Sequence, residues 1–309
     1  MPLTPELREL AARVSNWGRW GDDDERGTQN LIDAAATRRG VATVTSGRTR
    51  SLAIPLDQTS PQEGGAPGRI SPMRTMIAIN QTYVGSEGEA AFNDDMVVMS
   101  MAAGTHVDAL AHVTYDGLMY NGFPDSAVTA SGGATRCGAQ TLGPIISRGV
   151  LADLPSVKGL ECLDAGYAVT EADLDAAVEQ AKVSLQPGDV LLVRTGQMQH
   201  LHAGKTQKYN HDTPGLSTQT IEWIHRHDLG AVFTDTYVFE VWPPEDWGSM
   251  MPVHMIHLRD MGQIQGQNFD FESLAVDCAE EGRWEFLLTA APEPFTGGCS
   301  TPVAPLATF

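Results

Sequence analysis

The sequence predicts an α/β protein made of one domain around a mixed β-sheet. Two short, fully apolar runs at residues 190–193 and 230–233 have the composition of strands that are buried on both faces. Segments with helical spacing alternate with these strands in the second half of the chain, whereas the first half is mostly strand and loop. The richest Gly/Pro stretch, residues 60–68, is short and predicts a surface loop rather than a domain boundary.

The elements of the first half follow from local patterns. Residues 5–14 are the first expected helix, because Thr4 can cap it, Pro5 suits its first position and its apolar residues have helical spacing. Alternating apolar residues predict a strand at 51–56. Further strands are expected at residues 76–84, 96–101 and 149–154.

The second half has clearer punctuation. A helix is expected to begin at Thr170, because Asp173 follows three residues later in a capping-box arrangement. Gly262 is expected to end the helix at 251–261. The other expected elements are helices at residues 217–227 and 271–281 and strands at residues 230–233 and 284–288.

Composition limits the partners. The formal net charge of −19 disfavours nucleic acid and anionic lipid, which leaves a small-molecule substrate as the expected partner. We find no basic stretch followed by an apolar run at the start of the chain and no apolar run of membrane-spanning length. The four cysteines are scattered without a CxxC pair, which is typical of reduced thiols. A cytoplasmic protein is therefore expected.

The strongest candidate for a chemical centre is the run Gly-Thr-His-Val-Asp-Ala-Leu-Ala-His at residues 104–112. His106 and Asp108 are two residues apart, so their side chains project to the same side of an extended chain. An imidazole beside a carboxylate can bind Zn²⁺ or Mn²⁺, and His112 just beyond could act as general base. The alternative is a surface hydrogen bond, which the apolar residues 109–111 make less attractive.

The other histidines allow blander interpretations. His254 and His257 are three residues apart on an expected helix, and we expect one to face the site and the other to be solvated. The polar loop that contains His200, His202 and His211 predicts solvated side chains. A G-x-S-x-G elbow, a G-x-G-x-x-G turn after a strand and a Walker loop are all missing from the sequence. Serine-hydrolase, nicotinamide and nucleotide chemistry therefore lack support.

The pattern Gly104-Thr105-His106-x-Asp108-x-x-x-His112 resembles the core of the H-x-G-T-H-x-D-x-P-x-H motif of the cyclase family, which includes bacterial kynurenine formamidase and isatin hydrolase. Residues 16–21, 27–31 and 188–196 also resemble the longer branch of that family, so the resemblance covers nearly the whole chain. It implies a swivelling β/α/β-like single domain over residues 1–309. An N-terminal extension of about residues 1–48 would pack on this domain or on a partner subunit, in a homodimer or homotetramer.

The resemblance also implies a divalent-metal hydrolase that opens amide or cyclic amide bonds without a serine nucleophile. Carried over residue by residue, His106 and Asp108 are metal ligands with catalytic roles, and His112 transfers the proton. His254 matches the downstream ligand histidine, and Gln267 stands where the family has a glutamate.

Three positions depart from the family motif. Ala102 replaces the first histidine and supplies no ligand atom, and Leu110 replaces the proline. Gln267 can offer a neutral carbonyl oxygen, but it lacks the negative charge that two close dications need. We therefore expect at most one ion, Zn²⁺ or Mn²⁺, held by His106, Asp108 and His254, with Gln267 as a weak ligand or an orienting residue.

The leading hypothesis is a hydrolase of a small amide, cyclic amide, imide or lactam, in which His112 deprotonates a metal-bound water. Trp17, Trp20 and Trp242 could form an apolar wall for a ring-bearing substrate, although each could equally be a core residue.

Two alternatives stay open. The first is a metal-independent acid–base enzyme for hydrolysis, dehydration or isomerisation that uses His106, Asp108 and His112. The second is a non-catalytic small-molecule binding protein with a degenerate site.

Overall fold

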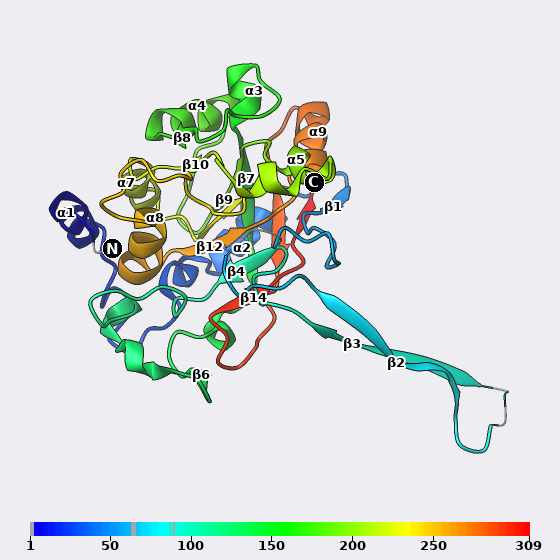
Figure 1. The fold of residues 1–309 in the computed structure, drawn as a ribbon. Helices are drawn as coiled ribbons and strands as arrows, with labels where there is room; N and C mark the ends of the chain where they lie inside the picture. Colours follow the sequence, from blue (N-terminus) through cyan, green and yellow to red (C-terminus); the bar gives the residue numbers. More distant parts are fainter. Residues whose placement is uncertain (1–2, 63–65, 87, 89) are drawn as a thin grey trace.

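A mixed β-sheet runs through the centre of the molecule (Figure 1). The computed structural model describes residues 3–62, 66–86, 88 and 90–309, and in these residues the sheet has nine strands in the order β1-β15-β13-β7-β9-β11-β12-β4-β14. Strands β7, β9, β11 and β12 are parallel, and antiparallel strands flank them on both sides. The strands are β1 (Thr49–Ser51), β4 (His106–Asp108), β7 (Ile145–Asp153), β9 (Val190–Arg194), β11 (Ala231–Thr234), β12 (Ile264–Gln267), β13 (Glu285–Ala290), β14 (Ser300–Pro302) and β15 (Leu306–Thr308).

The central strands are buried on both faces, as their apolar composition predicts. Every residue of β9 and β11 is buried. Along β9, Val190 and Leu192 pack into one hydrophobic cluster, whereas Leu191 and Val193 pack into another. Alternate side chains of a strand point to opposite faces, so each face of the sheet has its own core. The α/β class with a mixed sheet is confirmed.

Helices cover both faces of the sheet, and α1 and α4 begin at the caps that the sequence predicts. The Thr4 hydroxyl accepts a hydrogen bond from the Leu7 N–H at the start of α1, and Thr170 and Asp173 form the expected capping box of α4. The α-helices are α1 (Pro5–Arg13), α2 (Ala34–Val41), α3 (Leu154–Lys158), α4 (Glu171–Ala181), α5 (Met198–His202), α6 (Thr206–Asn210), α7 (Thr220–Arg226), α8 (Pro252–Met255) and α9 (Glu272–Glu281). Within the described chain, none of them is long and apolar enough to span a bilayer.

Irregular and short elements complete the fold. The helix expected at 251–261 is α8 followed by a π-helix over Ile256–Met261, which ends at the left-handed Gly262. Short 3-10 helices lie at Gly27–Leu31, Tyr120–Gly122, Asp125–Ala127 and Ala139–Thr141. Small two-stranded pairings join β5 (Val128–Thr129) to β6 (Gly133–Ala134) and β8 (Ala168–Val169) to β10 (Gly215–Leu216).

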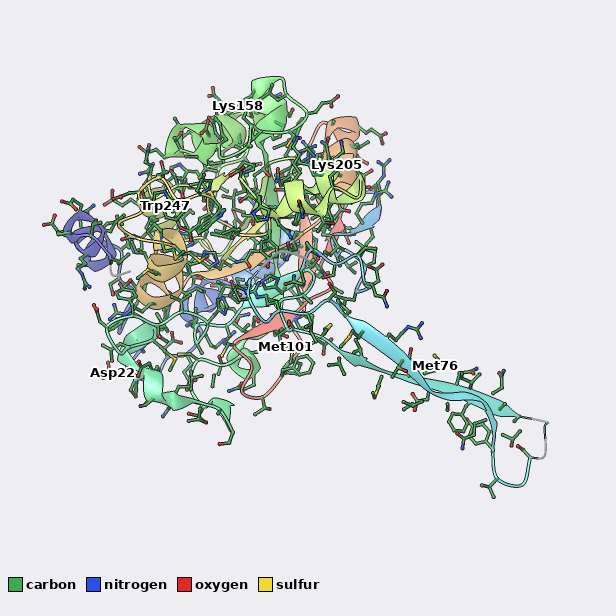
Figure 2. The ribbon with its side chains drawn as sticks, in the orientation of Figure 1. Asp22, Met76, Met101, Lys158, Lys205 and Trp247 are labelled. Carbon is green, nitrogen blue, oxygen red and sulfur yellow. The ribbon has the colours of Figure 1, made fainter. Side chains whose placement is uncertain are left out.

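An antiparallel hairpin extends far from the sheet (Figure 1). Its strands are β2 (Met73–Thr82) and β3 (Ala91–Val98), and we call the two together the arm. Almost every residue of the arm is exposed, and Figure 2 shows Met76 well away from the body of the protein. The strand expected at 76–84 overlaps most of β2, whereas the strand expected at 96–101 overlaps only the last three residues of β3, and neither was expected to leave the main sheet.

Two local expectations were wrong. The strand expected at 51–56 is absent, because β1 ends at Ser51 and the following residues make only a bridge from Ala53 to Phe269. The surface loop expected at 60–68 begins inside the protein. The Gln62 amide there is buried and donates to the carbonyl oxygens of Ala102 and Ala103. Residues 63–65 lie outside the described part.

Candidate functional site

Strand β4 brings the two central motif residues to one face of the sheet. His106 and Asp108 alternate with Val107 on this strand, and His106 Nε2 lies 3.7 Å from Asp108 Oδ1. The antiparallel register between β4 and β12 places Gln267 directly opposite His106. The His106–Asp108 pair, which the sequence predicts, and Gln267, which the pairing of β4 with β12 brings in, therefore lie at the same site.

His106 presents a free ring nitrogen to the site. Its Nδ1 lies 2.8 Å from the Gly104 carbonyl oxygen, so Nδ1–H donates there and Nε2 carries the lone pair. Burial lowers the pKa of His106, which keeps the ring neutral. Both His106 Nε2 and Asp108 Oδ1 are buried and have no hydrogen-bond partner among the described residues. Unpaired buried polar atoms that converge in this way are typical of a ligand site.

Asp108 stays ionised across the neutral range. Burial alone would raise its pKa, but His112, His106 and His254 together with the Gln265 amide lower it to about 2. Its second oxygen, Oδ2, accepts hydrogen bonds from Gln265 Nε2 at 3.2 Å and Gln267 Nε2 at 2.9 Å.

His112 connects this carboxylate with the open side of the site. Its Nε2 lies 3.8 Å from Asp108 Oδ1, and its side chain is partly exposed. The Asp108 carboxylate raises the pKa of His112, but burial, His254 and Arg69 outweigh this effect, so the pKa lies below its ordinary value. A histidine that is neutral at neutral pH can accept a proton, as a general base must.

A buried glutamate fixes the orientation of His254. Glu240 Oε1 accepts the backbone N–H of His254 and lies 2.6 Å from its Nδ1, and Oε2 accepts the N–H of Val253. Nδ1–H of His254 therefore donates to Glu240, which leaves Nε2 as an acceptor.

Gln267 occupies the space between two groups that could bind a metal. Its amide nitrogen lies 2.9 Å from Asp108 Oδ2 and 3.1 Å from His254 Nε2. The two N–H bonds of one amide can serve both acceptors. In this arrangement Gln267 acts as a donor and not as a ligand.

The site has too few free donor atoms for two cations. His106 Nε2 and Asp108 Oδ1 are free to face an ion, whereas Asp108 Oδ2 and His254 Nε2 already receive the Gln267 amide. Ala102 is buried and contributes no donor. In the described residues, no group of three or more His, Cys, Asp or Glu side chains is arranged to hold a metal.

A cavity of about 420 Å³ lies beside this site. Its size suits a small molecule. His112, His254 and Gln267 form its chemical side. The remaining lining residues are Ala66, Pro67, Arg69, Asn210, His211, Tyr237, Val238, Trp242, Met250 and Met251.

Comparison with known proteins decides the family. The Cyclase family model matches residues 50–241. A crystal structure described as a novel cyclase is 35% identical, with a TM-score of 0.88 over 100% of both chains. This chain belongs to the cyclase family.

More distant members of the same fold carry functional names. Isatin hydrolase A from Ralstonia solanacearum is 18% identical, with a TM-score of 0.61 over 89% of this chain and 94% of its own. A structure described as a potential metal-dependent hydrolase with cyclase activity is 15% identical, with a TM-score of 0.53 over 85% of this chain and 98% of its own. At these identities the likeness shows the fold. No curated protein sequence matches this chain.

The tryptophans of this cyclase-family protein do not gather at one place. Trp242 lines the cavity, but Trp17 and Trp20 are not among its lining residues. The Trp17 Nε1–H donates to the carbonyl oxygen of Arg259, whose guanidinium lies over the Trp17 ring. Trp20 packs under the guanidinium of Arg19.

The sequence expectation for the second helical histidine was wrong. His254 lines the cavity, but His257 is fully buried beside Phe239 rather than solvated. Neither of its ring nitrogens has a hydrogen-bond partner within the described chain. The π-helix changes the angular spacing of residues, so helical periodicity could not place this ring.

Sequence reasoning missed three residues of the site. Glu240 is fourteen residues from His254, and no local spacing connects them. Gln265 differs from Gln267 by one strand repeat, so a site assignment to Gln267 could have included it. Arg69 follows a Pro-Gly turn in a loop, where the sequence has no feature that marks a site.

Proposed function

We propose that this protein hydrolyses a small amide, cyclic amide, imide or lactam, and that His112 is the general base. One observation carries the proposal: His112 Nε2 lies 3.8 Å from the ionised Asp108 carboxylate and lines a cavity of about 420 Å³. The chemical names of the structural neighbours, isatin hydrolase among them, support a hydrolase.

The roles of the residues follow from their charges. His112 Nε2 takes a proton from the attacking water, and the resulting imidazolium is stabilised by the nearby Asp108 carboxylate. The same nitrogen then gives the proton to the departing amide nitrogen. Without this proton the nitrogen would be a poor leaving group, because it would have to depart as a strongly basic anion. His106 Nε2 also lies near Asp108 Oδ1, at 3.7 Å, and burial keeps this ring neutral.

We propose one divalent ion, Zn²⁺ or Mn²⁺, as the cofactor. His106 Nε2 and Asp108 Oδ1 would hold it, and His254 and Gln267 would contribute only if the Gln267 amide turned away from both of its present acceptors. When bound, such an ion polarises the substrate carbonyl and makes water more acidic.

The metal-independent alternative also has a specific observation in its favour. The Gln267 amide already donates to Asp108 Oδ2 and His254 Nε2, so these two atoms need no ion to satisfy them. Elemental analysis of freshly purified protein separates the two versions. Loss of turnover on chelation, restored by Mn²⁺ or Zn²⁺, supports the ion, whereas full turnover after exhaustive chelation supports the metal-independent enzyme.

A panel of small cyclic imides, lactams and aryl formamides tests the reaction itself. His112→Ala is expected to lower kcat by about 10²- to 10⁴-fold, the range for removal of a general base. His202→Ala is the matched control, because His202 is an exposed histidine paired with Asp270 outside the cavity. Turnover that survives in His112→Ala would remove the proposed mechanism.

We also propose that the chain forms a homodimer or homotetramer and works in the cytoplasm. The arm supports the first point, because seven of its large apolar residues and the adjoining Tyr83 and Val84 are exposed, and an isolated hairpin is marginally stable in water. Four free cysteines support a reducing compartment. The nine residues are Met73, Met76, Ile77, Ile79, Tyr83, Val84, Met96, Val97 and Val98.

A further inference from the structure

The cavity has an unusual charge for this protein. The chain carries 39 acidic residues against 20 lysines and arginines, yet no acidic side chain is among the described lining residues. Among those lining residues, Arg69 is the single side chain that is always charged. A positive group in a cavity without nearby lining carboxylates attracts anions.

A turn fixes the backbone at Arg69. Residues 66–69 form a turn in which the Arg69 N–H donates to the Ala66 carbonyl oxygen at 3.2 Å. Pro67 occupies the second position, and Gly68 has a φ of +84° at the third, which is the combination that a type II turn requires. The N–H of Ala66 donates to the Tyr237 hydroxyl at 2.8 Å, so the turn is attached to another wall of the same cavity.

The guanidinium of Arg69 is also free to bind. It makes no ion pair or hydrogen bond with the residues that the structure describes, in contrast to the buried Arg194, which pairs with Asp153 and Glu272. A guanidinium presents a planar fork that matches a carboxylate in two parallel hydrogen bonds. An arginine beside a cavity can therefore gain both bonds from a ligand without first breaking an internal pair.

The rest of the lining describes the other end of that ligand. Tyr237, Val238, Trp242, Met250 and Met251 give the cavity an apolar and partly aromatic wall. Such a wall buries a ring or a hydrocarbon body. The described lining has no second permanent cation for a doubly charged group, so a singly charged carboxylate fits better than a phosphate.

We propose that Arg69 is a specificity-determining residue that binds a carboxylate of the substrate. The substrate is then a small amide or cyclic amide with an apolar, ring-bearing body and a carboxylate group separate from the bond that is cleaved. The identity of that bond rests on the proposed function, whereas the anion site rests only on the cavity and Arg69.

Binding without turnover tests the anion site separately from the chemistry. The probes are 2-naphthoate and 2-naphthylmethanol, which share one ring system and differ in charge, and calorimetry measures both. We expect the wild-type protein to bind 2-naphthoate about 10- to 100-fold more tightly, the range for a charge-assisted hydrogen bond. Arg69→Gln removes this preference, and Arg69→Lys keeps part of it, because lysine retains the charge without the fork.

Arg74→Gln is the matched control, since Arg74 is an exposed arginine on the arm and does not line the cavity. It is expected to keep the wild-type preference. Circular dichroism of each variant checks that the fold is intact. Arg69 lies in a loop, so its substitution removes no core side chain. Equal binding of the two probes to wild type, no binding of either, or a preference that survives in Arg69→Gln would overturn the proposal.

Kinetics provides a second readout once a substrate has been found. With a carboxylate-bearing substrate, Arg69→Gln is expected to raise KM by the same 10- to 100-fold while kcat changes little. With the corresponding neutral carboxamide, wild type and Arg69→Gln are expected to have equal KM values. A preference for 2-naphthoate in a protein that hydrolyses no amide would refute the proposed function and leave the anion site standing.

Discussion

Replacement of Gln267 by glutamate tests how the site compensates its negative charge. The Gln267 amide nitrogen lies 2.9 Å from Asp108 Oδ2 and 3.1 Å from His254 Nε2, and all three side chains are buried. Gln267→Glu exchanges a donor for a second carboxylate beside the first. Loss of a hydrogen bond to a charged group costs about 1.5–3 kcal/mol. Two carboxylates about 3 Å apart repel by about 5–6 kcal/mol at an effective dielectric constant of about 20.

The repulsion is limited because one carboxylate can take up a proton instead. We therefore expect Gln267→Glu to lose about 3–5 kcal/mol of unfolding free energy at neutral pH in the presence of a chelator. Urea unfolding measures this loss. Addition of Mn²⁺ should restore the stability, because an ion that binds only the folded state stabilises it by RT ln(1 + [L]/Kd).

Gln265→Glu is the matched control. Gln265 also donates to Asp108 Oδ2, at 3.2 Å, but within the described structure it makes no hydrogen bond with His254. It should lose comparable stability in chelator and recover less with Mn²⁺. The reasoning fails if Gln267→Glu is as stable as wild type in chelator, or if Mn²⁺ stabilises it no more than Gln265→Glu.

Three further predictions concern pH and assembly. Because the pKa of His112 lies below 6.5, kcat/KM should rise with pH through an apparent pKa below that value and then stay level; a profile with no acid limb would contradict the role of His112. Burial lowers the pKa of His257 from 6.5 to about 3, so the unfolded chain binds the proton first. The His257 contribution should lower stability by about 1.4 kcal/mol for each pH unit between 6.5 and about 3, and His257→Leu should flatten urea-unfolding free energies between pH 6.5 and 5. The double variant Met76→Asp/Ile79→Asp should be a monomer where the wild type is an oligomer, as measured by light scattering. A monomeric wild type would refute this prediction.

Local patterns predicted much of the fold. The caps at Thr4 and Thr170 were correct because a cap depends on hydrogen bonds within one turn of the helix. Buried strands were predictable from apolar runs, because a strand that is covered on both faces is apolar at every position. The projection of the arm was not predictable. The composition of β2 and β3 is that of ordinary strands, and composition does not show whether a hairpin joins the main sheet or extends away from it.

The candidate site divides in the same way. His106 and Asp108 could be placed together because residues two apart on a strand share a face. Glu240 and Arg69 could not, since each reaches the site through long-range packing: Glu240 through the start of α8, and Arg69 through a turn bonded to Tyr237.

The sequence by itself determined the chemical identities of the site. It showed that Ala102 has no ligand atom, that Gln267 lacks a negative charge, and that His106, Asp108 and His112 are present. Only the tertiary structure decided what these groups do to one another. The register of β12 on β4 places the Gln267 amide between Asp108 and His254, and the cavity leaves Arg69 without an internal partner in the described residues. The energies of hydrogen bonds and of charge–charge interactions depend on distance. Residues far apart in the sequence come within such distances only when the chain folds.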